Sequence, residues 1–575
     1  MGYEKEDAIY PSHWKLNERS AEHYDIQKDE LFQKYANQSL PINKKRTRAG
    51  LTAYAGAWTV KQQKHLLRRC MFGVKQSDMT AIATLTPGTA VDFLLNNVPL
   101  APPPPVNNYN GTYADPTNVA LGSTWVNSTY GDGTVNYHRN LSLKAWWMSN
   151  IVNQNTSIIE KMVMFMHNNF TIEMQGANYA ISSYKYVELL RTHALGNLKT
   201  FIKELSKDAA MLRYLNGHYN VKLSPDENYG RELQELFTVG KGGPLQYTEA
   251  DVKAAARALT GWRVNFNDST VSFDPAEHDD TNKQFSSYYN GYVLNGLSGV
   301  NGANELDNLV DLLFTKDQDI AKYYARKIYR FFVYYDIDTN IENTIINGLA
   351  QTLINNNWDV KPMISQLLKS DHFFDSVSMD CFISTPIDFF AGTFRAMESE
   401  ISPSVGLEDE YRSYYRLVQY AANAGQNLGD PPSVSGWPAF YQVPHFHEMW
   451  INSDTLPKRL QTTDALLTVN GAYVSATTRL KYDVMRFANS LPNPGDPVAV
   501  VDYCVEYFLG LSLSQNLKDY YKSILLAGQT SNYYWTNAWA NYAGSPTNAT
   551  YLGVVRSRLQ GMLTELFRMA ERHLG

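Results

Sequence analysis

Residues 144–168 read KAWWMSNIVNQNTSIIEKMVMFMHN, and this stretch already indicates the fold class. Its large apolar side chains recur at the three- and four-residue spacing that places them on one face of a helix. They are Trp147, Ile151, Ile158, Met162, Phe165 and Met166. The stretch therefore predicts one or two amphipathic helices with a buried face.

Helical spacing extends over most of the chain. Further helices are predicted within 184–215, 320–332, 341–356, 361–370, 386–397 and 483–575. Alternation typical of a strand is limited to short pieces such as Thr270–Phe273. We therefore predict an all-α fold of many orthogonally packed helices, with small β elements and long irregular loops.

Shifts in composition divide the 575 residues, which are too many for one ordinary core, into three parts. Residues 1–50 read as a polar N-terminal arm. Residues 51–480 read as a helical core with a loop insertion rich in Pro, Asn and Gly at about 101–137 and an irregular stretch at about 265–304. Residues 481–575 are predicted to form a C-terminal helical subdomain packed on that core.

Composition and charge argue against several classes of protein. The net charge is −6, with 51 Lys and Arg against 57 Asp and Glu, so we expect no nucleic-acid partner. The three cysteines lie far apart and contain no C-x-x-C, which excludes a cysteine-rich zinc module. No apolar run reaches the roughly 18 residues of a membrane helix, and the N-terminus MGYEKEDAIY lacks the apolar centre of a signal peptide.

The segment 224–237, SPDENYGRELQELF, is the richest in charged residues. Ser224 followed by Pro225 predicts a helix start, and Glu227 in its first turn has a capping explanation. Polar side chains then recur every three or four residues along one face: Asn228, Arg231, Glu232 and Glu235. Such a face is ordinary when exposed, but buried charges must be paired or must bind a metal.

Two histidines stand beside other groups that can bind a metal or move a proton. His167 ends an apolar run and precedes Asn168 and Asn169, so it is either a satisfied core histidine or a ligand or general base. His278 lies in the acidic sequence 277–280, EHDD, which is either a solvated turn or, with Asp279, a source of metal ligands.

The segment 425–438 is a rigid, non-helical turn that contains Gln426 and presents Trp437. It leads to His445 and His447, whose alternate spacing would place them on one face of an extended segment, a weak indication of a metal site. The familiar local motifs of hydrolases, nucleotide-binding proteins and haem proteins are absent from the sequence.

In combination, motifs between about residues 51 and 460 resemble the domain-of-unknown-function-1800 family. The matching pieces are His65–Arg69 with Phe72-Gly73, Glu160–His167 with Phe170, Asp208–Leu212 with Tyr214-Leu215, Glu227–Tyr229 with Arg231–Leu233 and Glu235–Thr238, Tyr247–Glu249 with Asp251-Val252, Ala256–Trp262, His278-Asp279, Lys283, Gly425-Gln426 to Gly436–Pro438, Trp450-Ile451 and Arg459. The C-terminal helices resemble the version found in Bacteroidetes-type bacteria.

The resemblance implies a bacterial, extracytoplasmic protein that works beside a sulfatase-like or phosphatase-like partner. The family commonly has a second histidine where this chain has Asn169, so His167-Asn168-Asn169 replaces His-x-His. Asn is a poor ligand for a transition metal, which makes a metal site at this position less favourable here.

Three functions follow from these patterns. The first is a metal-dependent hydrolase acting on a polar or anionic substrate. Its catalytic residues would be His167, Arg231, Glu232 and Glu235, and a divalent metal would be held among His167, Glu232, Glu235, His278 and Asp279. Substrate would contact Asn228, Trp262, Gln426 and Trp437.

The second function is a non-catalytic binding or assembly module, in which the same charges lock the helix packing. The third is carbohydrate recognition by a surface rich in Tyr (39) and Trp (11).

Overall fold

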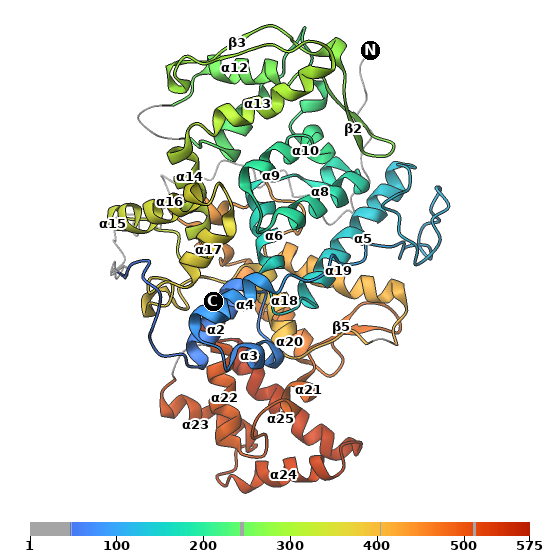
Figure 1. Ribbon diagram of the computed structural model, residues 1–575. Coiled ribbons are helices and arrows are strands. Elements are labelled where there is room, and N and C mark those ends of the chain that lie inside the picture. Colours follow the sequence, from blue (N-terminus) through green and yellow to red (C-terminus); the bar gives the residue numbers. More distant parts are fainter. Residues whose placement is uncertain (1–46, 48, 242–245, 403, 510–512) are drawn as a thin grey trace, which may run out of the picture. The chain divides into compact units, whose positions relative to one another are not determined.

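A computed structural model describes residues 47, 49–241, 246–402, 404–509 and 513–575 (Figure 1). Nearly all of the predicted N-terminal arm therefore lies outside the described residues. Residues 47–575 form one unit in their internal contacts. The predicted boundary near residue 480 stays a prediction. Across it, α20 (Thr455–Leu467) packs on α25 (Ala549–Phe567).

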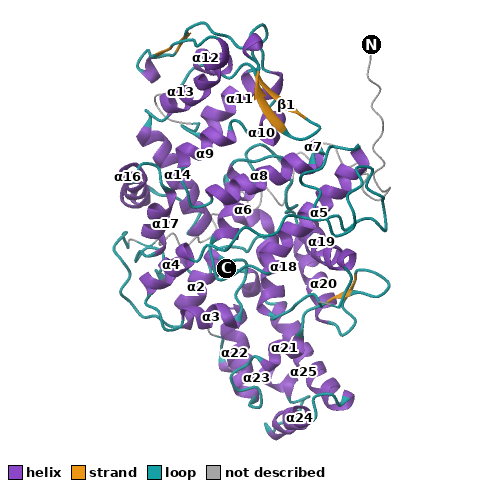
Figure 2. Cartoon of the chain, turned by 45° about the vertical axis from the view of Figure 1, so that its right-hand side comes forward, coloured by secondary structure: helices purple, strands orange, loops and turns teal. Residues whose placement is uncertain are grey.

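Helices make up most of the chain (Figure 2). The first group is α2 (Val60–Cys70), α3 (Gln76–Ile82), α4 (Pro87–Asn96), α5 (Gly133–Val152), α6 (Ile159–Asn169), α7 (Met174–Ala177), α8 (Ala180–His193), α9 (Leu198–Leu205) and α10 (Ala209–Tyr214). The central group is α11 (Glu227–Glu232), α12 (Glu249–Ala258), α13 (Asn304–Leu313), α14 (Asp317–Phe332), α15 (Thr339–Ile341), α16 (Asn347–Asn355), α17 (Val360–Leu368), α18 (Pro386–Ala396) and α19 (Leu407–Asn423). Between α20 and α25 lie α21 (Val484–Asn489), α22 (Pro497–Leu509), α23 (Gln515–Leu525) and α24 (Tyr533–Gly544).

Strands form only small antiparallel pairs in the described chain. They are β1 (Trp262–Asn265) with β2 (Thr270–Phe273), β3 (Lys283–Gln284) with β4 (Val293–Leu294), and β5 (Ala472–Tyr473) with β6 (Arg479–Leu480). Trp262 opposes Phe273 in the first pair. The prediction of a mainly helical fold with small β elements is confirmed, and so is the strand predicted at Thr270–Phe273.

The apolar stretch at 144–168 forms the two helices α5 and α6, which are separated by a short break. The Asp132 carboxylate accepts the backbone N–H of Val135 at 2.7 Å and thereby caps the start of α5. Trp147 and Phe165 are fully buried, as the spacing predicts. α5 packs on α8, α18 and α19, and α6 packs on α8, so these two helices lie at the centre of the helical packing.

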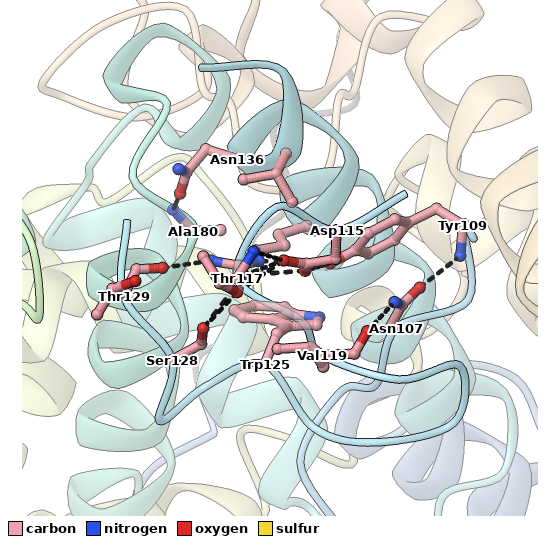
Figure 3. A network of polar contacts seen from close by, with 12 residues as sticks. Asn107, Tyr109, Asp115, Thr117, Val119, Trp125, Ser128, Thr129, Asn136 and Ala180 are labelled. Carbon is pink, nitrogen blue, oxygen red and sulfur yellow. Dashed lines mark hydrogen bonds and ion pairs between the residues drawn. The ribbon is translucent and has the colours of Figure 1, made fainter. Parts of the chain in front are cut away.

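The loop insertion predicted at 101–137 is fastened to α5 by a buried ion pair (Figure 3). Arg139 of α5 donates to both carboxylate oxygens of Asp115, at 2.9 and 3.1 Å, and neither side chain is exposed. The Arg139 guanidinium also donates to the Thr129 carbonyl at 2.7 Å and to the Thr117 hydroxyl at 2.7 Å. Because buried charges are stable only when paired and hydrogen-bonded, this loop is held to a defined shape.

No helix in the described part of the chain is long and apolar enough to span a bilayer.

We expect removal of one charge of the Arg139–Asp115 pair to destabilise the fold more than removal of both. Asp115→Asn keeps the shape but leaves a buried guanidinium without its counter-charge, so we expect a loss of about 3–5 kcal/mol in the free energy of unfolding. Urea denaturation measures this loss, and Asp268→Asn, which changes an exposed carboxylate, serves as the matched control. The double variant Asp115→Leu/Arg139→Met removes both charges and is expected to be less destabilised than Asp115→Asn. A loss below about 1 kcal/mol for Asp115→Asn would contradict this account.

Candidate functional site

His167 lies in the last turn of α6, fully buried among aromatic rings. Its Nδ1 is 3.2 Å from the Tyr186 hydroxyl, and its Nε2 has no hydrogen-bond partner among the described residues. Trp147 and Trp437 meet the imidazole edge-on, with ring centroids 5.2 and 5.7 Å away. Burial, and then the charge of Lys144, lower the pKa of His167 to about 3, so the ring is neutral at ordinary pH. The structure thus brings two predicted site residues, His167 and Trp437, into contact.

A glycine makes the contact between His167 and Trp437 possible. Gly436 has φ +88°, and a Cβ on it would lie 2.1 Å from the backbone oxygen of Asn168. The Asn168 side chain then accepts the backbone N–H of Trp437 at 2.9 Å. Only glycine fits a backbone approach this close, so Gly436 fixes the turn against the end of α6.

The charged stripe of α11 faces other surface charges. Arg231 donates to Glu249 at 2.6 and 2.7 Å and to Glu227 at 3.3 Å. Glu235 accepts a hydrogen bond from Lys241 at 2.7 Å, and Glu232 is half-buried. Burial, followed by the charge of Glu235, raises the pKa of Glu232. These contacts tie α11 to α12 and to the residues that follow α11.

The predicted helix start at Ser224 and Pro225 is wrong. Ser224 closes a turn onto Val221, and α11 begins at Glu227 with Asp226 as its cap, whose carboxylate accepts the Asn228 N–H at 2.8 Å. Asp is as favourable as Ser at the N-cap position, and Asp226 directly precedes the first helical residue. The helix therefore starts after Asp226 and not after Ser224. Glu227 pairs with Arg231 instead of capping.

His278 and Asp279 each have partners of their own. His278 is buried, with Nε2 3.0 Å from Glu305 and Nδ1 2.9 Å from the Thr260 carbonyl. Glu305 also forms a buried ion pair with Lys283. Asp279 accepts from Arg257 at 2.6 Å. Burial opposes ionisation of Asp279, but hydrogen bonds from Arg257 and Thr281 prevail and hold its pKa well below the usual range.

The remaining predicted contact residues have packing partners. Asn228 donates to the Leu215 carbonyl at 3.2 Å, and Gln426 accepts the Ile387 N–H at 2.9 Å. Trp262 packs edge-on against Phe273. Within the described ranges, no three His, Cys, Asp or Glu side chains gather into a group that could hold a metal ion. The five predicted ligands therefore do not form such a set.

A basic cleft lies at the junction of α2, α6, α14 and α18 with the segment 438–450. Its main pocket encloses about 1010 Å³, including its open mouth, and an adjoining pocket encloses about 770 Å³. Both are lined by Arg330, Phe331 and Phe440, so we treat them as two halves of one cleft, the main half and the second half.

Positive charge dominates the lining of this cleft. Among the described residues, seven cationic side chains line it against one acidic side chain, that of Asp388, and the last residue, Gly575, also lines the main half; the cations are Arg68, Arg69, Lys161, Arg326, Lys327, Arg330 and Arg572. Three have carboxylate partners, in the pairs Arg68–Asp380, Lys161–Asp388 and Arg326–Glu342. The other four have no carboxylate within 4.0 Å in the described chain. Because the net charge of the whole chain is −6, the excess of positive charge is confined to the region of the cleft.

Segments far apart in the sequence meet at the cleft, and most of them carry the motifs quoted above. Arg68, Arg69 and Gly73 come from the first motif and Lys161 from the second. The second half adds Asn169 and Leu236. Gly73, at φ +71°, packs so closely on Gly392 that a Cβ would lie 2.3 Å from the Gly392 oxygen. This contact brings α2 against α18 at the cleft wall.

The model of the family described as "protein of unknown function (DUF1800)" matches residues 65–552. The chain belongs to this family. The match covers every segment that lines the cleft except the last residues of the chain, including Arg572. Neither a curated protein nor a solved structure matches the chain.

Sequence reasoning missed the part of the cleft that α14 supplies. Tyr323, Arg326, Lys327 and Arg330 recur at three- and four-residue spacing and all line the second half. This periodic basic face was readable, but it also fits an exposed helix. Contacts with residues far away in the sequence decide whether such a face lines a cleft or is exposed to solvent, and a local pattern does not contain them.

His167 predicts a specific dependence of stability on pH. Its pKa is about 3 in the folded chain and about 6.5 when unfolded, so below pH 6.5 the unfolded state binds the extra proton. Stability contributed by the neutral ring is complete above pH 6.5 and is lost as the pH falls toward 3, by up to about 1.4 kcal/mol per pH unit.

Denaturation between pH 6.5 and 4 tests this expectation. His167→Gln should flatten the fall in unfolding free energy by nearly one proton equivalent, whereas His445→Gln, at an exposed histidine, should leave the slope unchanged. An identical slope in His167→Gln and the wild type would show that His167 does not titrate as described.

Proposed function

We propose that this chain is a binding protein whose basic cleft holds an anionic ligand with an apolar or aromatic part. The observation that carries the proposal is the ratio of charged side chains in the described lining, seven cationic to one acidic. Cations brought together in a partly buried space repel one another and lose hydration, and an anion removes both costs. The proposal corresponds to the binding module among the functions that the sequence suggested.

Arg572 supports the proposal through its burial. Its guanidinium donates to the Thr393 hydroxyl, but its Nε has no partner, and burial followed by the charge of Arg68 lowers its pKa to about 10. Behind it Arg459 is also buried, with Nε and Nη1 unpartnered, and both guanidiniums lie 5.1–5.2 Å from the Phe389 ring centroid. Together they add positive potential to the wall of the main half.

Arg330 stands where the two halves meet. Its Nε donates to the Tyr335 carbonyl at 3.2 Å, and burial, followed by the charge of Arg326, lowers its pKa. A guanidinium without a carboxylate partner presents a planar pair of donors that matches carboxylate, phosphate or sulfate. Arg330 is therefore the residue that we expect to contact the anion directly.

Aromatic rings supply the apolar part of the lining. Phe331 stacks on Phe440 at 5.7 Å, and Phe440 packs edge-on against Trp450 at 6.1 Å. Phe382 lies 4.2 Å from the Arg69 guanidinium carbon and covers it. Pockets that join apolar walls to a few fixed polar groups are typical of small-molecule sites.

Metal-dependent hydrolysis remains the second candidate, and the ion pair Lys161–Asp388 at the cleft wall favours it. Asp388 carries the one acidic side chain in the described lining and is partly exposed, as a general base or metal ligand must be. Elemental analysis of the purified protein with and without chelator tests this candidate. Bound metal that disappears in Asp388→Asn supports it, and a metal-free protein of unchanged stability in chelator counts against it.

Compartment and partner are further proposals from the family resemblance. We propose an extracytoplasmic protein of the Bacteroidetes type, working beside a sulfatase-like or phosphatase-like partner. The proposal fits the cleft chemically, since sulfate and phosphate esters are the anions that such a partner would handle.

Calorimetric titration with phenyl phosphate tests the binding function, with neutral benzyl alcohol as the uncharged comparison. We expect phenyl phosphate alone to bind, with affinity that falls as salt rises. Arg330→Gln removes one charge-assisted hydrogen bond and should weaken binding about tenfold. Arg556→Gln, at a partly exposed arginine of α25 outside the cleft, should bind as the wild type does. No binding to the wild type, or unchanged binding in Arg330→Gln, would contradict the proposal.

A further inference from the structure

Lys327 of α14 stands out among the cations of the second half of the cleft. Its Nζ donates to the Leu236 carbonyl at 2.8 Å, and no carboxylate lies within 4.0 Å of it in the described chain. None of the described residues that line this half is Asp or Glu. The amine is therefore not held as one member of an ion pair.

Two aromatic rings lie near the amine. Nζ lies 4.3 Å from the Tyr323 ring centroid and 5.9 Å from that of Phe170. Ring faces favour a cation, whereas loss of water disfavours it. Burial, followed by the charge of Arg330, prevails and lowers the pKa of Lys327 to about 7. The amine therefore loses its proton more readily than that of an ordinary lysine.

The carbonyl that positions Lys327 comes from an unusual element. Residues Leu233–Phe237 continue α11 as a single π-helical turn, which interrupts the regular helical ladder. Such turns occur often at functional sites. Leu236 lies within this turn and lines the second half, so the turn both shapes the pocket and holds the amine at its wall.

The second half also holds groups that suit a reacting carbonyl compound. Arg330, three positions after Lys327 on α14, lines the same half and has no carboxylate within 4.0 Å in the described chain, so its guanidinium can hold an anionic group. Asn169 donates its amide N–H to the Phe165 carbonyl at 2.8 Å, so its amide oxygen can still accept a hydrogen bond.

We propose that Lys327 forms an imine with an aldehyde or ketone group of the ligand, so that the cleft selects carbonyl-bearing organic anions. The Nζ lone pair attacks the carbonyl carbon, a C–N bond forms, and a proton passes from nitrogen to the former carbonyl oxygen to give a carbinolamine. Loss of that oxygen as water, with the second amine proton, leaves the C=N bond. No electrons are transferred to or from a further reagent. The choice of an anionic ligand rests on the proposed function, whereas the reactivity of the amine does not.

Pyridoxal 5′-phosphate, an aromatic aldehyde with a phosphate group, is the probe, and borohydride then fixes any imine for peptide mapping by mass spectrometry. At pH 7.5 we expect one adduct per chain, at Lys327, formed on the order of a hundredfold faster than at an ordinary surface lysine with pKa about 10.4. Lys322→Met, on the same helix but outside the pocket lining, is the control and should label normally. Lys327→Met should lose the adduct.

Two comparisons separate failure of the imine from failure of anion binding. Pyridoxal without phosphate should label Lys327 about tenfold more slowly, and Arg330→Gln should remove that difference. Adducts spread over many lysines, or an unlabelled Lys327, would overturn the imine proposal even if phenyl phosphate binds. Equal labelling by pyridoxal and its phosphate would keep the reactive amine but overturn the selection of anions.

Discussion

The close approach of Gly436 to the end of α6 is the contact on which the arrangement of the cleft depends. Without a side chain at Gly436 the turn can reach the backbone oxygen of Asn168, and the Asn168 amide then holds the N–H of Trp437. The following residues are thereby aligned along α14, where Phe440 stacks on Phe331. A larger residue at 436 would separate these walls, because backbone atoms cannot move aside as a flexible side chain can.

Electrostatics gives this arrangement its chemical character. The helices could have packed with their cations paired, as Arg139 and Asp115 are under the loop insertion. At the cleft four cations have no carboxylate within 4.0 Å among the described residues, and the buried Arg459 adds to the same potential. Uncompensated buried charge lowers stability, so its presence is better explained by a ligand than by folding. His167 differs from these cations, because burial among aromatic rings lowers its pKa and keeps the ring uncharged.

Local sequence predicted the helical fold, whereas the partners of the charged side chains could not be read from it, for one physical reason. Helix spacing at 144–168 and alternation at Thr270–Phe273 are properties of neighbouring residues, and both predictions are confirmed. Whether a charge is paired depends on distant residues: Lys161 meets Asp388 across 227 positions, and Arg231 meets Glu249 of the next helix. The stripe on α11 therefore looked exceptional in sequence but has surface partners, whereas Arg330 and Lys327 looked ordinary but have no carboxylate partner in the part of the chain that the structure describes.

A crystal structure of the protein grown with phenyl phosphate tests the central claim most directly. The account predicts the phosphate within hydrogen-bond distance of Arg330, and the ring against Phe331 or Phe440. Phosphate density on α11 at Arg231, or a cleft that stays empty at saturating phenyl phosphate, would contradict it.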